Sequence, residues 1–259
     1  MLLQIIRTEW LKVKSYRTFW IMLSLFVVLV ISINYIAILL MKFVKDKSGN
    51  LFDPVLYDYP TVWQSVAFLG SFVSLLLGLL IIILVCNEYT FKTHRQNVID
   101  GWSRQQFMVS KLFWVVALSV FAMIICVITG IIFAAVYGTH GFSLENFSYV
   151  GYFFLQCLMS LTIAMLIAVL VRRAGLGIVL YLAYVMLENI LQVVINKNLG
   201  NWGRLLPLES ADRLLGFPFV EKLLPDDAAY PVGIYLLMLV IYIVGANFFV
   251  GRRLLKMDL

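Results

Sequence analysis

The chain has 259 residues, of which 63 % are hydrophobic and only 13 % are charged, with a formal net charge of +6. The charged share is about half that of an ordinary soluble domain, which excludes a water-soluble enzyme of usual composition. The positive charge suits anionic lipid rather than nucleic acid, because no soluble basic domain interrupts the apolar runs.

Six apolar stretches are each long enough to cross about 30 Å of hydrocarbon as a helix. They lack the alternation of apolar and polar residues that marks membrane barrel strands, so we predict an all-α membrane protein. In chain order the predicted spans are 18–41, 63–86, 112–136, 149–171, 174–195 and 232–250. Residues 1–259 are expected to form a single transmembrane domain. Gly70, Ser74 and Gly78, at a spacing of four, predict a face for close helix packing.

Residues 1–17 precede the first span and are amphipathic at helical spacing. Apolar residues, including Trp10 and Val13, share one arc, and basic residues such as Lys12 lie opposite. This pattern predicts a helix that lies in the membrane interface. Glu9 falls within the apolar arc, where two interpretations stay open. It either reaches water by snorkelling or faces protein as an ion-pair partner.

The loop of residues 87–111 between the second and third spans is basic and amphipathic. Thr93 to Asp100 is expected to form a short helix, which Gly101 ends. Ser103 and Gln106 then form a capping box that starts a helix leading into the third span. A helix that only anchors this loop in the interface is one interpretation, and a docking surface for a soluble partner is the other. Glu88, at the end of the second span, is a further ion-pair candidate, together with Glu9 and Lys12.

Polar residues inside spans are candidates for a pathway or a subunit interface: Glu188, Asn189, Asn34 and Gln156. A carboxylate at the centre of a span costs about 2.5–3.5 kcal/mol, so Glu188 is expected to avoid lipid. Residues 197–231 contain four prolines between apolar and charged residues and are too polar to span. They are predicted to form an external helical segment, and whether it re-enters the bilayer stays open.

Basic residues concentrate near both ends of the chain and in the 87–111 loop, which places both termini in the cytoplasm. The chain is thus expected to be a multi-pass protein of the cell membrane. It has no phosphate-binding GxxxxGK[ST] motif, so ATP is not expected to bind to it. Cys86, Cys126 and Cys157 lack metal-ligand spacing, and no metal site or catalytic residue is predicted.

The loop resembles the cytoplasmic loop of ABC-2-type transporter permeases. In that family an acidic residue ends span two and is followed by Thr-x-Arg, a turn, Ser-Arg and a Lys that opens span three. The matching residues here are Glu88, Thr93-His94-Arg95, Gly101, Ser103-Arg104 and Lys111. The N-terminus is similar as well, with Glu9-x-x-Lys12, Arg17 and Phe19-Trp20. Gly101-Trp102 departs from the family, where many relatives carry a Pro near the turn.

The resemblance implies a permease subunit of an ABC exporter that works by alternating access. Its partners would be two copies of an ABC ATPase, a second permease subunit, the same or similar, and membrane lipid. The cofactors ATP and Mg²⁺ would be held by the ATPase and none by this chain. The residues expected to contact the ATPase are Phe91, Lys92, Thr93, Arg95, Gln96, Val98, Ile99, Asp100, Gly101, Trp102 and Arg104.

Two other classes of function stay open. One is a non-transporting membrane protein that uses an ATPase to send a signal across the membrane. It would need a large external domain, and the longest external segment here is residues 197–231. The other is an ion-coupled secondary transporter, which predicts activity without an ATPase and usually an internal repeat, of which the sequence shows none that is convincing.

Overall fold

The computed structural model describes residues 2–48, 56–91, 93, 103–216 and 230–255. The regular structure within these ranges is helical, which confirms the predicted all-α class. The elements in chain order are α1 (Leu2–Lys14), α2 (Arg17–Ser48), α3 (Val62–Thr90), α5 (Arg104–Tyr137), α6 (Ser148–Val171), α7 (Ala174–Leu199), the 3-10 helix η1 (Asn201–Leu205), α8 (Pro207–Leu215) and α10 (Val232–Leu255).

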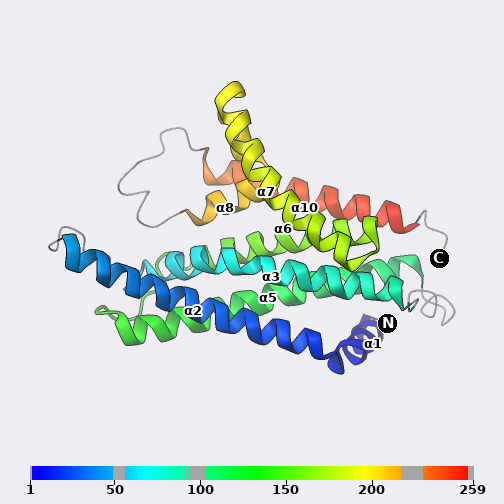
Figure 1. Cartoon of the computed structure of the whole chain (residues 1–259), viewed down its shortest axis with the longest axis horizontal. Coiled ribbons are helices and arrows are strands. Elements are labelled where there is room, and N and C mark those ends of the chain that lie inside the picture. The colour runs from blue at the N-terminus through cyan, green and yellow to red at the C-terminus, as the bar shows by residue number, and fades with distance from the viewer. Residues whose placement is uncertain (1, 49–55, 92, 94–102, 217–229, 256–259) are drawn as a thin grey trace.

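Six of the described helices, α2, α3, α5, α6, α7 and α10, are long and apolar enough to cross a membrane. Each contains one of the predicted spans. Most run side by side along the longest axis of the molecule, and both ends of the chain lie at the same end of the bundle (Figure 1). An even number of crossings requires this placement of the termini.

Helices α3 and α6 form the centre of the bundle. Large side chains such as Trp63, Leu77 and Phe153 are fully buried there. The small residues of α3 allow close packing as predicted: a Cβ atom at Gly70 would lie 3.2 Å from the Phe153 ring, and one at Gly78 would collide with the Tyr181 hydroxyl of α7. The Tyr181 hydroxyl lies 2.6 Å from Ser160 Oγ of α6, so α3, α6 and α7 meet at this point.

Helix α7 diverges from the bundle, and its C-terminal end projects away from the other helices (Figure 1). Of the most apolar stretch of 18 residues in α7, only 11 % is buried. Its exposed apolar side chains include Met186, Leu187, Ile190, Val193 and Val194. Such a surface is stable in hydrocarbon or beneath another chain, and not in water.

At the end of the bundle away from the termini, short segments are held by specific bonds. The Asp58 carboxylate accepts hydrogen bonds from the Thr139 backbone N–H, from the Thr139 hydroxyl at 3.0 Å and from the His140 backbone N–H at 3.2 Å. The segment before α3 is thereby tied to the end of α5. Helix α8 packs on α6 and α10 through buried leucines, among them Leu208, Leu214 and Leu215.

Candidate functional site

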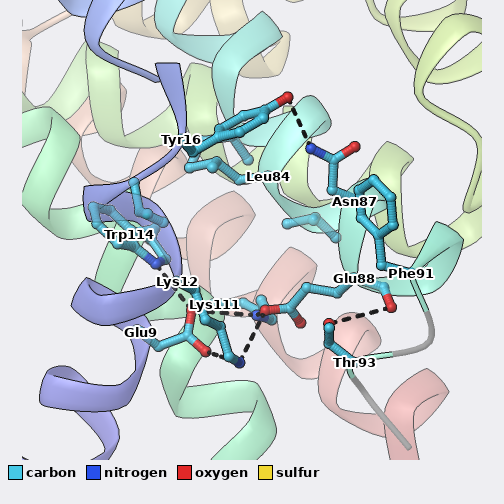
Figure 2. Close-up of a pocket in the computed structure, with 13 residues that line it drawn as sticks. Glu9, Lys12, Tyr16, Leu84, Asn87, Glu88, Phe91, Thr93, Lys111 and Trp114 are labelled. Carbon is cyan, nitrogen blue, oxygen red and sulfur yellow. Dashed lines mark hydrogen bonds and ion pairs between the residues drawn. The ribbon is translucent and has the colours of Figure 1, made fainter. Parts of the chain in front are cut away.

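Four charged side chains from three helices meet at the end of the bundle that carries the termini. Glu9 and Lys12 come from α1, Glu88 from α3 and Lys111 from α5, and we call this set the charge cluster (Figure 2). Lys12 Nζ lies 2.8 Å from Glu9 Oε1 and 3.4 Å from Glu88 Oε1. Lys111 Nζ lies 2.5 Å from Glu88 Oε1 and 3.6 Å from Glu9 Oε2. Each lysine therefore bridges both glutamates, and the formal charges cancel.

Burial makes the pairing necessary. The side chains of Glu9 and Lys111 are each 2 % exposed and that of Glu88 is 9 % exposed, while Lys12 keeps 26 %. A charge removed from water is stable only where opposite charges and hydrogen bonds replace the lost solvation. Trp114 of α5 contributes such a bond, because its Nε1 donates to Glu9 Oε2 at 3.0 Å. Glu9 therefore faces protein and does not snorkel.

The electrostatics of α1 follow from this arrangement. Burial alone would raise the pKa of Glu9, but attraction to Lys111 and Lys12 and the hydrogen bonds from Lys12 and Trp114 lower it below its ordinary value. Burial alone would likewise lower the pKa of Lys12, but attraction to Glu88 and Glu9 raises it. Both groups are consequently charged at neutral pH.

A second set of contacts fixes the turn between α1 and α2. Asn87 Nδ2 of α3 donates to the Tyr16 hydroxyl at 3.0 Å. The Phe19 ring at the start of α2 packs edge-on against Trp114, with centroids 5.4 Å apart. Helix α1 is therefore joined to α3 and α5 and does not only lie on the membrane surface.

A pocket of about 300 Å³ opens beside the charge cluster between α1, α3 and α5 (Figure 2). One part of its lining is polar and contains the cluster together with Asn87 and Thr93. The other part is apolar. Its residues are Val13, Ile81, Leu84, Val85 and Trp114, and the rings of Tyr16 and Phe91 complete the lining.

The comparison with known protein families agrees with this architecture. Residues 5–194 match the family described as ABC-2 family transporter protein, over more than half of the chain. The chain belongs to the ABC-2 transporter family. No curated protein matches the chain in a sequence search. The matched region contains the whole charge cluster and ends within α7, so η1, α8 and α10 lie beyond it.

Most of the residues predicted to contact an ATPase lie outside the described ranges of this ABC-2 permease: Lys92, Arg95, Gln96, Val98, Ile99, Asp100, Gly101 and Trp102. Of the others, Phe91 is 71 % exposed, and the Thr93 hydroxyl donates to the Glu88 backbone carbonyl at 3.5 Å. Arg104 begins α5. The predicted capping box is confirmed, since Gln106 N–H donates to Ser103 Oγ while Ser103 N–H donates to Gln106 Oε1.

Lys111 and Trp114 were not among the predicted ion-pair residues. Lys111 is the Lys that opens the third span in the family pattern, and a basic residue in that position commonly anchors a span to the headgroups. The sequence held a weak signal for a buried role, because no other charged residue occurs between Lys111 and the end of the span. Nothing local identifies Trp114 as the donor to Glu9.

The polar span residues have separate places in the permease. Glu188 is buried, and its Oε1 accepts hydrogen bonds from the backbone N–H groups of Leu208 at 2.5 Å and Glu209 at 3.1 Å, at the start of α8. Asn189 instead donates to the Val185 carbonyl within α7 and is exposed. Gln156 donates to Ser74 Oγ, and Asn34 accepts from the Tyr57 hydroxyl. Glu188 thus joins α7 to the external segment, and Gln156 of α6 contacts the same segment through a hydrogen bond with the Asp212 side chain.

Proposed function

We propose that this permease is the membrane subunit of an ABC exporter, in which two ATPase copies dock below two permease subunits. ATP and Mg²⁺ would belong to the ATPases. The observation that carries the proposal is the Glu88–Lys111 contact of 2.5 Å. These residues lie at the two ends of the 87–111 loop, so the base of the loop is clamped at a point where α1 is attached as well.

Such a clamp suits a loop that transmits force. A load on the loop would reach α3 and α5 together, because Glu88 and Lys111 hold them in one unit. Lys12 and Trp114 would pass the same displacement to Glu9 on α1, and through the Tyr16 turn to α2. Movement of α2, α3 and α5 as one body is the kind of rigid-body motion that alternating access requires. The charge cluster thus connects α1 to α3 and α5 in addition to the bond between Tyr16 and Asn87.

We infer that the end bearing the charge cluster faces the cytoplasm. Basic residues gather at this end, including Lys14 at the end of α1, Arg17 at the start of α2 and the pair Arg172–Arg173 between α6 and α7. An excess of Lys and Arg in short loops favours the cytoplasmic side. Both chain ends then lie in the cytoplasm, and the α8 segment lies on the outer side.

The test is ATP hydrolysis in proteoliposomes that contain this permease and the ABC ATPase from the same organism that co-purifies with it. We expect the permease to bind that ATPase and alter its hydrolysis rate. Arg95→Glu or Gln96→Pro in the loop should abolish the effect while the chain still inserts. Lys197→Glu, a charge reversal on the opposite side, is the matched control. If the loop variants co-purify with a fully stimulated ATPase, the docking assignment is wrong.

A signal transmitter would show the same hydrolysis but no movement of cargo. Its sequence requirement, a large external domain, is not met by residues 197–231. A secondary transporter would retain full activity in liposomes without any ATPase, and that result would overturn the proposal as a whole.

A further inference from the structure

The coupling role uses the charge cluster but leaves the pocket beside it unexplained. The pocket has a volume of about 300 Å³, at the lower end of the range for small-ligand sites. Charged side chains and apolar side chains both line it, so the lining is amphipathic. Three of the charged side chains in the wall, Glu9, Glu88 and Lys111, are more than nine-tenths buried, so the polar end is a built part of the fold.

The lining changes in order along α3. Glu88 and Asn87 are at the polar end, Leu84 and Val85 lie about one turn further into the span, and Ile81 lies about two turns in. Seven residues of helix separate Glu88 from Ile81, which is about 10 Å at 1.5 Å per residue. Polar groups therefore lie at the membrane surface and apolar groups deeper. One leaflet of a bilayer has the same order, whichever side of the membrane this end faces.

The charges of the cluster favour a ligand that carries both a positive and a negative group. The cluster holds two ammonium and two carboxylate groups, with no net charge. An anionic headgroup would approach two carboxylates without its own cation, and a cationic group would approach two lysines. A zwitterionic headgroup can place its phosphate toward Lys12, the most accessible member, and its ammonium toward the carboxylates. Tyr16, Asn87 and Thr93 supply further hydrogen-bonding groups in the wall.

We propose that this pocket binds the headgroup and the first part of an acyl chain of a zwitterionic phospholipid, such as phosphatidylethanolamine. The volume suits this part of the lipid, and the rest of the chains would extend beyond Ile81 along α3. The inference rests on the membrane placement in the proposed function but not on the ATPase. Leu84, half-buried in the apolar wall, is the residue whose enlargement should close the site.

The experiment uses the full chain without any ATPase, so its outcome is independent of the docking proposal. The protein is delipidated in detergent and incubated with equal amounts of phosphatidylethanolamine and phosphatidylglycerol, and the retained lipids are counted by native mass spectrometry. We expect about one phosphatidylethanolamine per chain, retained at least about tenfold better than phosphatidylglycerol, a preference that corresponds to about 1.4 kcal/mol. Leu84→Trp should remove this preference. Leu76→Trp, the same change two turns away on α3 outside the pocket, should keep it.

Three results would overturn the proposal. Equal retention of the two lipids by the wild-type chain would show that the charge cluster does not distinguish the headgroups. This measurement does not depend on the folding of any variant. Unchanged retention by Leu84→Trp, in a protein whose helix content matches the wild type, would place the lipid elsewhere. Complete displacement by soluble glycerophosphoethanolamine would assign the pocket to a free zwitterion instead of a membrane lipid.

Discussion

Removal of Lys111 is the sharpest test of the charge cluster. Its side chain is 2 % exposed and its ammonium lies between Glu88 and Glu9, so Lys111→Met leaves the two buried carboxylates with Lys12 as the other lysine of the charge cluster. Breaking a buried ion pair by removal of one partner typically costs about 3–5 kcal/mol, because the other charge stays buried without compensation. Lys12 is 26 % exposed, and water replaces part of its role. Lys12→Met should therefore cost clearly less, about 1–2 kcal/mol, between the values for surface and buried pairs.

The assay is reversible unfolding in mixed detergent micelles, followed by helix content, for the single variants Lys111→Met and Glu88→Gln and for the double variant. Groups in direct contact show coupling energies of about 0.5–3 kcal/mol in such cycles, and the 2.5 Å pair should lie in the upper half of that range. The double variant should then be more stable than the sum of the single losses implies. Equal losses of unfolding free energy for Lys111→Met and Lys12→Met would refute the view that burial makes this cluster essential. A coupling energy of zero between Lys111 and Glu88 would refute it as well.

Three further predictions concern other parts of the permease. Gly78→Ala should destabilise the chain by about 1–3 kcal/mol through overpacking against the buried Tyr181, whereas Gly151→Ala on α6, where a Cβ meets nothing within 4 Å, should be near neutral in the same unfolding assay. A Gly78→Ala chain as stable as wild type would contradict the packing. Burial tends to raise the pKa of Asp58, but hydrogen bonds from Thr139 and His140 lower it below its ordinary 3.8. The stability from this clamp is thus present above pH 3.8 and lost as the pH falls through the lowered value, so a thermal melt should show less acid sensitivity in Asp58→Asn, with Glu145→Gln as the exposed control. Glu188→Leu removes the acceptor for the first N–H groups of α8 and should make the external segment more open to protease, by an effect of about 1 kcal/mol or more, while Leu187→Ala on the exposed side of α7 should not. Equal cleavage of the two variants would show that Glu188 does not hold α8.

Sequence by itself determined the helices and several of their ends. Apolar length decides which segments cross the membrane, since each span satisfies its own backbone hydrogen bonds, and all six predicted spans lie within observed helices. The capping box at Ser103 and Gln106 is equally local, because its two bonds join residues three apart. The small-residue face of α3 was readable from spacing alone, although its partners Phe153 and Tyr181 were not.

Tertiary structure decided which polar groups meet. Glu9 and Trp114 are 105 positions apart, and Lys12 and Glu88 are 76 apart, so no local pattern could pair them. Glu9 on an apolar arc was compatible with snorkelling or with protein contact, and Lys111 had the pattern of an ordinary membrane anchor. The choice depends on whether neighbouring helices exclude water and provide the opposite charge. In the same way, the sequence indicates only that Glu188 avoids lipid, and it is the fold that directs Glu188 toward the first N–H groups of α8.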